Sequence, residues 1–300
     1  MEEKAIEVKN LTKKFKKVTA VKNASFDVEY GELFAFLGPN GAGKSTTIRI
    51  LTTLAVPTSG DVHVAGYNVI KDGEKVRKKI GLVADKMILY DRLTAYENVE
   101  FFAKLYGMEP TEIKKRSDEL FEILEISEWR NEYVSKFSTG MKQKINIIRA
   151  LIPQPDILFL DEPTLGLDPH TTVSLRNFIK HLNKDMGKTI VLTTHDLHEV
   201  EMLADTIAII NKGEIVTKDS KNNVKEYFHE NPRVEVEFEN TQEAKLLTIE
   251  PLEIQGTRLT YQVNNLNEFL KEIDNKNIKL KHIKTIEPSL EDIFVKITSN

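Results

Sequence analysis

The nine residues from Gly38 to Thr46 constrain this chain more than any other part of its sequence. They match G-x-x-x-x-G-K-S/T, the phosphate-binding P-loop, and read Gly38, Pro39, Asn40, Gly41, Ala42, Gly43, Lys44, Ser45 and Thr46. The apolar run at residues 33–37 precedes the loop and is typical of a buried parallel strand. Residues 45–54 follow it and predict a helix with Ile48, Leu51 and Leu54 on one face. A strand, this loop and a helix in succession predict a nucleoside-triphosphate site and argue against a glycine-rich turn that matches by chance.

The residue types of this loop suit a triphosphate. Glycines let the backbone curl so that successive N–H groups face inward and bind phosphate oxygens. The start of the following helix adds about half an elementary charge of positive sign. We expect Lys44 to neutralise oxygens of the β- and γ-phosphates, and the hydroxyl of Ser45 to bind Mg²⁺.

The composition bounds the class of protein. A chain of 300 residues, 40% of them hydrophobic, can form one large or two modest domains. Its net charge of −4 argues against a protein that coats nucleic acid, and we interpret the lysine runs at 13–17 and 114–116 as solvated surface. The absence of cysteine excludes disulfides, thiol catalysis and cysteine metal sites.

The sequence contains no candidate for a membrane span. No apolar stretch approaches the roughly 18–20 residues that cross a bilayer, and the acidic N-terminus lacks the apolar region of a signal peptide. We therefore expect a cytoplasmic chain whose connection to a membrane comes through a partner.

Strands and helices alternate along most of the chain. Residues 5–36 predict strands joined by turns, and residues 94–150 predict helices that start at the capping box of Thr94 and Glu97. Further buried strands are predicted at the apolar runs 157–160, 190–192 and 207–210. The alternation predicts an α/β fold with a mostly parallel, helix-covered sheet.

The pattern changes after about residue 218. Residues 234–239 and 259–263 alternate apolar and polar side chains, as strands with one wet face do. Helices are predicted at residues 266–273 and 290–297. This part predicts a small α+β appendage, whose role we leave open between dimerisation or regulation and simple stabilisation.

Two carboxylates follow the strand predicted at residues 157–160. Asp161 and Glu162 lie at its carboxyl end, the edge of an open α/β sheet at which ligands bind. Asp161 can hold Mg²⁺ directly or through water, and Glu162 is placed to orient or deprotonate an attacking water.

With these motifs, the chain resembles ATP-binding cassette (ABC) transporter ATPases. Residues 137–143 resemble the family's signature loop, residues 165–168 match its D-loop, and residues 193–196 match its switch histidine, here His195. Phe15 occupies the position of the aromatic residue that stacks on adenine. The resemblance covers residues 5–217. It implies a P-loop NTPase cassette at 1–218, with a mostly parallel sheet, an antiparallel β subdomain and a helical subdomain at about 87–150, followed by an accessory α+β domain at 219–300.

The resemblance also implies a mechanism. Two cassettes pair head to tail, and each ATP lies between the P-loop of one chain and the signature loop of the other. Ser138, Thr139 and Gly140 would then bind the γ-phosphate across the interface, as a helix N-terminus binds an anion. His195 would contact the γ-phosphate and hold Glu162 and the water in line, so Glu162 and His195 are the expected catalytic residues.

The sequence departs from the family pattern at three positions. Thr139 replaces the first glycine of the signature, and Met141 replaces its glutamine. Asp85 stands where the Q-loop glutamine is expected, after a strand-like run at residues 80–84. An aspartate is a possible Mg²⁺ ligand there, but the alternative of a simple loop carboxylate remains equally open.

Two further segments resemble the exporter branch that includes sodium-efflux and drug-efflux ATPases. They are residues 89–98, in the region that couples cassettes to membrane partners, and residues 287–294 near the C-terminus. The resemblance implies an ATP- and Mg²⁺-dependent homodimer that drives a separate permease from the cytoplasmic face of the membrane, without a nucleic-acid partner. The alternatives are a soluble ABC protein and a regulatory module with weak turnover.

Overall fold

The computed structural model describes residues 4–85, 88–227, 233–286 and 294. The chain divides into two compact units, Met1–Asp219 and Ser220–Asn300. Each unit has its own hydrophobic core.

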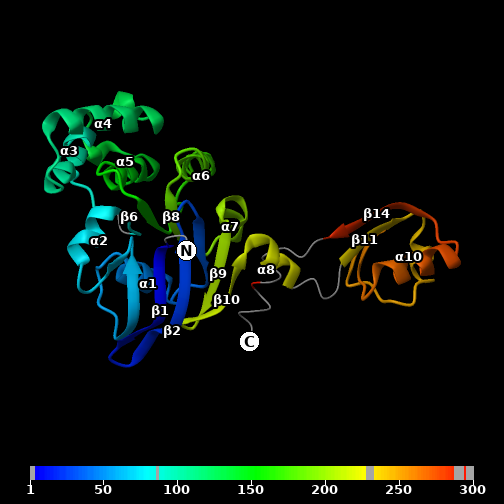
Figure 1. Cartoon of the computed structure of the whole chain (residues 1–300). Helices are drawn as coiled ribbons and strands as arrows, with labels where there is room; N and C mark the ends of the chain where they lie inside the picture. The colour runs from blue at the N-terminus through cyan, green and yellow to red at the C-terminus, as the bar shows by residue number, and fades with distance from the viewer. Residues whose placement is uncertain (1–3, 86–87, 228–232, 287–293, 295–300) are drawn as a thin grey trace. The chain divides into compact units, whose positions relative to one another are not determined.

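A six-stranded sheet forms the centre of the first unit (Figure 1). Its strands, in spatial order, are β10 (Glu214–Ser220), β9 (Thr206–Asn211), β3 (Leu33–Leu37), β8 (Thr189–Thr194), β7 (Ile157–Asp161) and β6 (Ile80–Val83). The pairs from β9 through β6 are parallel. The apolar runs at 33–37, 157–160, 190–192 and 207–210 all lie in these strands, so the predicted parallel sheet is confirmed.

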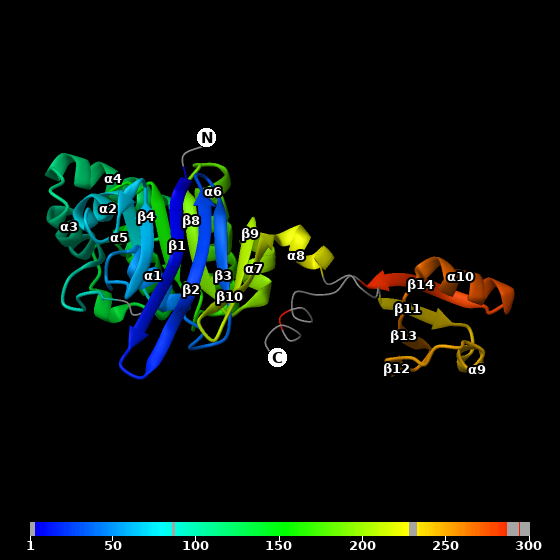
Figure 2. The ribbon, with the colours of Figure 1, turned by 60° about the horizontal axis from the view of Figure 1, so that its bottom comes forward.

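A second sheet is antiparallel and packs against the first through a shared core. It contains, in spatial order, β2 (Val18–Glu29), β1 (Lys4–Phe15), β4 (Ser59–Val64) and β5 (Tyr67–Asn68), the first three of which run side by side in Figure 2. Phe26 of β2 stacks on Phe34 of β3, with ring centroids 5.6 Å apart. This packing fixes β3, and therefore the loop that follows it.

Helices complete the first unit. Those that follow strands of the parallel sheet are α1 (Lys44–Leu51), α6 (Pro169–Lys184) and α7 (Leu197–Leu203), whereas α2 (Gly73–Lys79) follows β5 and leads into β6. A helical segment between β6 and β7 contains α3 (Ala95–Leu105), α4 (Pro110–Ile123), α5 (Thr139–Leu151) and two short 3₁₀ turns at Ser127–Trp129 and Val134–Lys136. In Figure 1, α3, α4 and α5 lie together at one end of the unit.

The helical predictions for the first unit are confirmed except at one helix end. The capping box of Thr94 and Glu97 starts α3 as predicted. The helix predicted over residues 45–54 is wrong at its C-terminal end, because α1 stops at Leu51. Thr53 has a left-handed φ of 64°, which ends the helical path, and Leu54 is 58% exposed instead of packed on the apolar face.

The second unit is a small α+β fold. After α8 (Lys221–Tyr227) its elements are β11 (Arg233–Phe238), α9 (Thr241–Ala244), β12 (Glu253–Gln255), β13 (Arg258–Gln262), α10 (Leu266–Asn275) and β14 (Leu280–Ile286). The antiparallel sheet has the order β12-β13-β11-β14. From β11 onward this is the βαββαβ arrangement of ferredoxin-like domains. The helix predicted at 290–297 and the motif at 287–294 lie outside the described residues, apart from Phe294.

Candidate functional site

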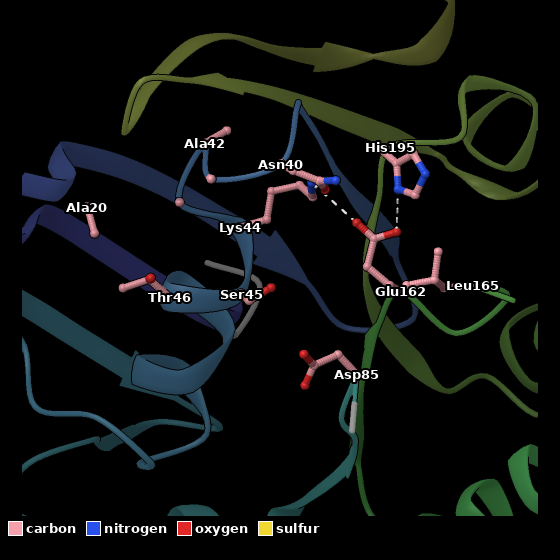
Figure 3. A pocket seen from close by; sticks show the side chains of 12 residues that line it. Ala20, Asn40, Ala42, Lys44, Ser45, Thr46, Asp85, Glu162, Leu165 and His195 are labelled. Atoms are coloured by element: carbon pink, nitrogen blue, oxygen red, sulfur yellow. Dashed lines mark hydrogen bonds and ion pairs between the residues drawn. The ribbon is translucent and has the colours of Figure 1, made fainter. Parts of the chain in front are cut away.

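A cavity of about 400 Å³ opens at the carboxyl ends of the parallel strands, where the P-loop joins β3 to α1 (Figure 3). Its lining comes from the P-loop, from β2, and from the segments at the ends of β6, β7 and β8. The lining residues are Ala20, Asn40, Gly41, Ala42, Gly43, Lys44, Ser45, Thr46, Asp85, Glu162, Leu165 and His195. The structure thus brings together residues that are up to 175 positions apart in the sequence.

Two of the P-loop glycines are required by close backbone contacts. A Cβ atom on Gly38 would lie 2.3 Å from the carbonyl oxygen of Ile210, and one on Gly43 would lie 2.5 Å from that of Ala20. Gly43 also has a φ of 115°, which side chains rarely allow. These contacts seat the loop against β9 and β2 and turn it around the cavity.

Lys44 reaches back over the loop that precedes it. The side chain is only 5% exposed, and its Nζ donates to the carbonyl oxygens of Gly38 (2.7 Å) and Pro39 (3.3 Å). Nζ also forms an ion pair with Oε1 of Glu162 at 3.3 Å. The sheet therefore places a buried cation in direct contact with a carboxylate that arrives from β7.

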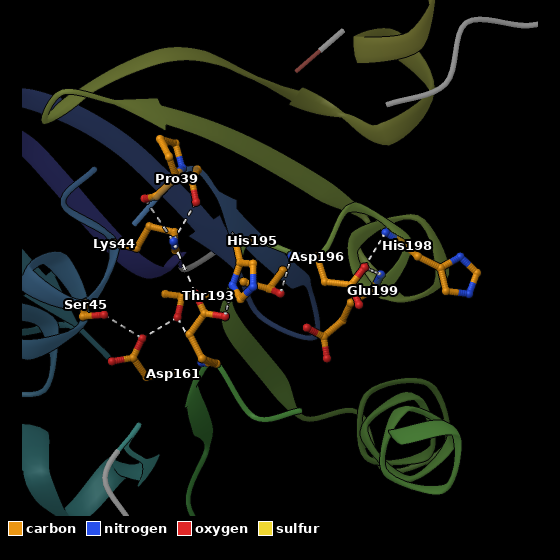
Figure 4. Close-up of polar contacts among 12 residues, drawn as sticks. Pro39, Lys44, Ser45, Asp161, Thr193, His195, Asp196, His198 and Glu199 are labelled. Carbon is orange, nitrogen blue, oxygen red and sulfur yellow. Dashed lines mark hydrogen bonds and ion pairs between the residues drawn. The ribbon is translucent and has the colours of Figure 1, made fainter. Parts of the chain in front are cut away.

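Asp161 is held by two hydroxyl groups (Figure 4). Its Oδ1 accepts hydrogen bonds from Ser45 Oγ, at 3.0 Å, and from Thr193 Oγ1. Burial raises the pKa of Asp161, and the neighbouring charges of Asp85 and Glu162 add to this effect, whereas the two hydroxyls oppose it. A buried carboxylate with two further acidic groups nearby lies in a region of negative charge, where binding of a cation is favourable.

Glu162 lies between Lys44 and His195. Its Oε2 is 2.8 Å from Nδ1 of His195, so its two oxygens face two different partners. The backbone of Glu162 has a left-handed φ of 51°, which costs a residue of this type on the order of 1–3 kcal/mol. The N–H of Glu162 donates to the Thr193 carbonyl at 3.0 Å, which helps to hold this strained conformation.

Asp85 enters the cavity just beyond the end of β6. In Figure 3 its carboxylate lies on the opposite side of the site from His195. Its charge contributes to the raised pKa of Asp161, so the two carboxylates influence each other. This placement is compatible with both interpretations of Asp85, the metal ligand and the simple loop carboxylate.

Six of the residues predicted to bind nucleotide do not line the cavity of this chain. Phe15 lies at the end of β1, is 49% exposed, and has the Nζ of Lys13 4.7 Å from the centre of its ring. Ser138, Thr139 and Gly140 lie at the start of α5, where Ser138 and Thr139 are exposed and Ser138 Oγ accepts from the Met141 N–H at 3.3 Å. Pro39 and Gly38 take part through their contacts with Lys44.

Sequence reasoning missed several contributors to this site, Ala20 of β2 among them. Thr193 binds Asp161, Leu165 lines the cavity, and Gln143 of α5 donates to the Pro163 carbonyl at 2.8 Å, next to Glu162. Thr193 lies level with Asp161 because β7 and β8 pair in a register that the sequence does not give. The Gln143 contact joins a helix to a loop, and no local pattern indicates it.

Aromatic side chains gather where the helical segment begins. Tyr90, Phe101 and Phe102 form a cluster in which Tyr90 and Phe101 are 5.1 Å apart and Phe101 and Phe102 are 5.3 Å apart. The Arg149 guanidinium lies 4.6 Å from the centre of the Phe102 ring and donates to the Ile88 carbonyl at 2.6 Å. Burial lowers the pKa of Arg149, and within the described residues it forms no ion pair. We call these five residues the Arg149 surface.

Comparison with known proteins agrees with this geometry. A family model for ABC transporters matches residues 21–165, and one for the C-terminal domain of DrrA1-3-like ATP-binding proteins matches residues 220–298. The linearmycin resistance ATP-binding protein LnrL of Bacillus subtilis (strain 168) is 35% identical, over 98% of both chains. The bacitracin transport ATP-binding protein BcrA of Bacillus licheniformis is 34% identical, over 97% of this chain and 96% of its own.

Solved structures give the same result. A dimeric ATP-binding cassette in a post-hydrolysis state, bound to ADP and Pi, superposes with a TM-score of 0.66 at 32% identity and covers 72% of this chain and 98% of its own. Within the described residues, no helix combines the length and apolar character needed to cross a membrane. The matches do not favour a soluble or regulatory ABC protein outside transport. The chain belongs to the ATP-binding subunits of ABC transporters, and it is an ATPase of that family.

Proposed function

We propose that the chain binds MgATP at the P-loop and hydrolyses it with Glu162 and His195, and that this drives a separate permease of an exporter. The observation that carries the proposal is the unbroken set of contacts from Lys44 through Glu162 to His195, with Ser45, Asp161 and Thr193 beside it. These contacts gather a cation, two carboxylates and an imidazole at one helix N-terminus.

The P-loop residues Gly38 to Thr46 would hold the phosphates. Lys44 Nζ has three oxygen contacts, to two carbonyl groups and to Glu162, and phosphate oxygens can replace some of them. Its surroundings are nearly closed to solvent, so a charge-assisted contact there is stronger than one in water. The adenine would lie beyond this loop, with Phe15 as the aromatic residue proposed to stack on it.

The residues present fit a magnesium ion. Mg²⁺ commonly takes one or two protein oxygens and completes its shell with phosphate oxygens and water. Ser45 Oγ and the carboxylate of Asp161 are such oxygens, and Asp161 lies in a region of negative charge. The part of the chain that the structure describes contains no cluster of three or more histidine or acidic ligands. Phosphate oxygens and water would supply the remaining ligands. The ion would offset negative charge on the phosphates, and Asp85 is a further candidate ligand.

Glu162 and His195 would direct the attacking water. The water oxygen forms a bond to the γ-phosphorus, its proton passes to the Glu162 carboxylate, and the bond to the β-phosphate oxygen breaks. Glu162 is held in one orientation because Lys44 and His195 each contact one of its oxygens. His195 is 46% exposed and is therefore accessible to a phosphate oxygen from the open side of the cavity.

A second copy of the chain would complete each site. Ser138, Thr139 and Gly140 are placed at the N-terminus of α5 and do not line the cavity of their own chain, although the exposed Ser138 and Thr139 are accessible to a partner. The dimeric cassette with bound ADP and Pi supports this arrangement. Thr139 brings a methyl and a hydroxyl group to this helix end, which a glycine would not.

The permease would contact the Arg149 surface. Tyr90 and Phe101 are exposed aromatic residues, and Arg149 is a cation with no ion-pair partner among the described residues. A partner segment with apolar side chains and one carboxylate would satisfy both. The cassette, which we propose spans residues 1–218, would then act at the cytoplasmic face of the membrane. The names of LnrL and BcrA support export of an antibiotic-like compound.

Two substitutions test the catalytic proposal. Lys44→Ala should weaken ATP binding by about 100-fold or more, since it removes the phosphate-binding cation. Glu162→Gln should keep ATP binding, lower kcat by about 100-fold or more, and stabilise an ATP-bound dimer. Binding is measured with a fluorescent nucleotide, turnover by phosphate release and dimerisation by light scattering. The control is His198→Ala, an exposed histidine three residues from His195. Normal turnover of Glu162→Gln would refute the role of Glu162.

A further inference from the structure

A fully buried carboxyl group, that of Glu199, lies close to the loop that carries His195. Glu199 is in the first turn of α7 and is 0% exposed. Within the described residues, no hydrogen bond of normal geometry reaches its Oε1 or its Oε2. Figure 4 shows its carboxylate directed away from the exposed His198. Such a group costs about 1–3 kcal/mol when neutral and more when charged, so stability alone does not account for it.

Three segments face this carboxyl group. They contribute the hydroxyls of Thr194 at the end of β8 and Thr164 after β7, and the guanidinium of Arg176 on α6, while Asp196 lies at the start of its own helix. Burial raises the pKa of Glu199, the two hydroxyls and Arg176 oppose the rise, and Asp196 adds to it. The neutral acid therefore persists to higher pH than it does for an ordinary glutamate.

Arg176 carries the second unsatisfied group. Its Nη2 donates to Oδ2 of Asp196 at 2.6 Å, but its Nε is buried and has no partner among the described residues. Asp196 directly follows His195, and its Oδ1 accepts from the N–H groups of His198 (2.9 Å) and Glu199 (3.3 Å). Arg176 thus anchors the turn that carries the catalytic histidine, and it retains an unused donor near the unused acceptors of Glu199.

We propose that Glu199 is a positioning residue for His195 that acts through Arg176. While Glu199 is neutral, the guanidinium stays on Asp196 and the His195 turn is anchored as observed. When Glu199 loses its proton, the more deeply buried anion takes the guanidinium in a two-pronged contact, and Asp196 is released into solvent. Turnover is then highest with Glu199 protonated and falls as it ionises. This inference rests on the proposed role of His195.

Glu199→Gln is the first test, because glutamine has the same shape but cannot ionise. We expect kcat at neutral pH within about twofold of the wild type. At alkaline pH, kcat of the variant should fall less than kcat of the wild type, because the variant cannot ionise at this position. ATP affinity, measured at each pH, should not change, since Lys44 and the P-loop are untouched. A pH profile identical to that of the wild type would overturn the proposal, and so would a kcat lowered about tenfold at neutral pH.

Asp196→Asn is the second test. The amide oxygen can still accept the two N–H groups that start α7, but the anion that holds Arg176 is gone. We expect kcat lowered by about fivefold or more across the whole pH range, with normal ATP affinity. A wild-type kcat in this variant would show that the Arg176 anchor does not position His195, and would overturn the proposal.

A third measurement does not depend on turnover. Infrared spectroscopy of the wild type at neutral pH should show the carbonyl band of a protonated carboxylic acid, and Glu199→Gln should lack it. Absence of this difference would overturn the proposal even if ATP is hydrolysed normally. Conversely, a protein with the band but without ATPase activity would refute the proposed function alone. His198→Ala is the matched control and should change none of these results.

Discussion

The glycines of the P-loop differ in what they do. A Cβ atom on Gly43 would collide with the Ala20 carbonyl oxygen at 2.5 Å, whereas one on Gly41 would meet nothing within 4 Å. Both residues have positive φ, 115° and 81°. The sequence motif treats them as one pattern, but only Gly43 is fixed by a neighbouring backbone. Gly43 therefore combines a close approach to a neighbouring backbone with the larger positive φ, whereas Gly41 has a positive φ alone.

This difference predicts unequal effects of two alanine substitutions. Gly41→Ala should lower the free energy of unfolding by about 1–2 kcal/mol, the cost of a left-handed backbone for an alanine. Gly43→Ala should lower it by about 3 kcal/mol or more, because strand β2 or the loop must also shift. Urea unfolding without nucleotide measures both values. Equal losses in the two variants would contradict the argument from the Ala20 contact.

At the same scale, the sequence predicted the chemical groups of the site better than their contacts. Lys44, Ser45, Asp161, Glu162 and His195 were identified from motifs, and the structure brings all five together. The Thr193 contact with Asp161 depends on strand register, and the buried state of Glu199 depends on packing among three segments. A local sequence pattern determines neither strand register nor tertiary packing. The roles of Thr193 and Glu199 therefore became evident only from the structure.

At the scale of elements, most strands were predicted because they are short apolar runs, and such runs are buried in a parallel sheet. The end of α1 was missed because apolar spacing continued to Leu54, while the left-handed Thr53 carries no local signal as clear as a glycine. Between elements, Gln143 ties α5 to Pro163, so the helix that begins with the signature residues is joined to the loop that follows Glu162.

The C-terminal end of the same helix carries Arg149, and its charge can be tested. Arg149→Glu should reduce the fraction of the chain that sediments with membranes about tenfold in cells that contain the permease, because it replaces the cation of the Arg149 surface with an anion. ATPase activity of the purified chain should stay within about twofold of the wild type. Arg77→Glu, an exposed position on α2 with the same charge change, is the control. Equal loss of membrane association in both variants would argue against the Arg149 surface.

At the scale of the whole molecule, the two units differ in how far the sequence described them. The cassette was predicted in outline because its motifs occur in a fixed order along the chain. The second unit was predicted only as α+β. Its helix α9 has four residues and its strand β12 has three, and elements this short show no recognisable periodicity in the sequence. Its βαββαβ order became evident from strand pairing, with β11 between β13 and β14.

The core of the second unit contains a phenol that gives the protein a specific alkaline sensitivity. Tyr261 is 0% exposed, lies 5.5 Å from the Phe269 ring centre, and its hydroxyl has no hydrogen-bond partner among the described residues. Burial raises the pKa of Tyr261 from 10.0 to about 12. Because the folded state holds this proton more tightly than the unfolded chain, the contribution of Tyr261 to stability is complete below pH 10 and is lost as pH rises toward 12.

Tyr261→Phe removes both the proton and the unsatisfied hydroxyl. We expect its free energy of unfolding at neutral pH to equal that of the wild type or exceed it by about 1 kcal/mol, since no hydrogen bond is lost. Between pH 10 and 12 the wild type should lose stability more steeply than the variant. Ionisation of the lysines and of the other tyrosines changes the stability of both proteins equally. The difference in stability is measured by guanidinium unfolding at a series of pH values. Hydrogen exchange of amides in β11 and β13 then assigns it to the second unit. Parallel curves for the two proteins would show that Tyr261 ionises equally easily in the folded and unfolded chains, and that its burial does not set the alkaline limit of this unit.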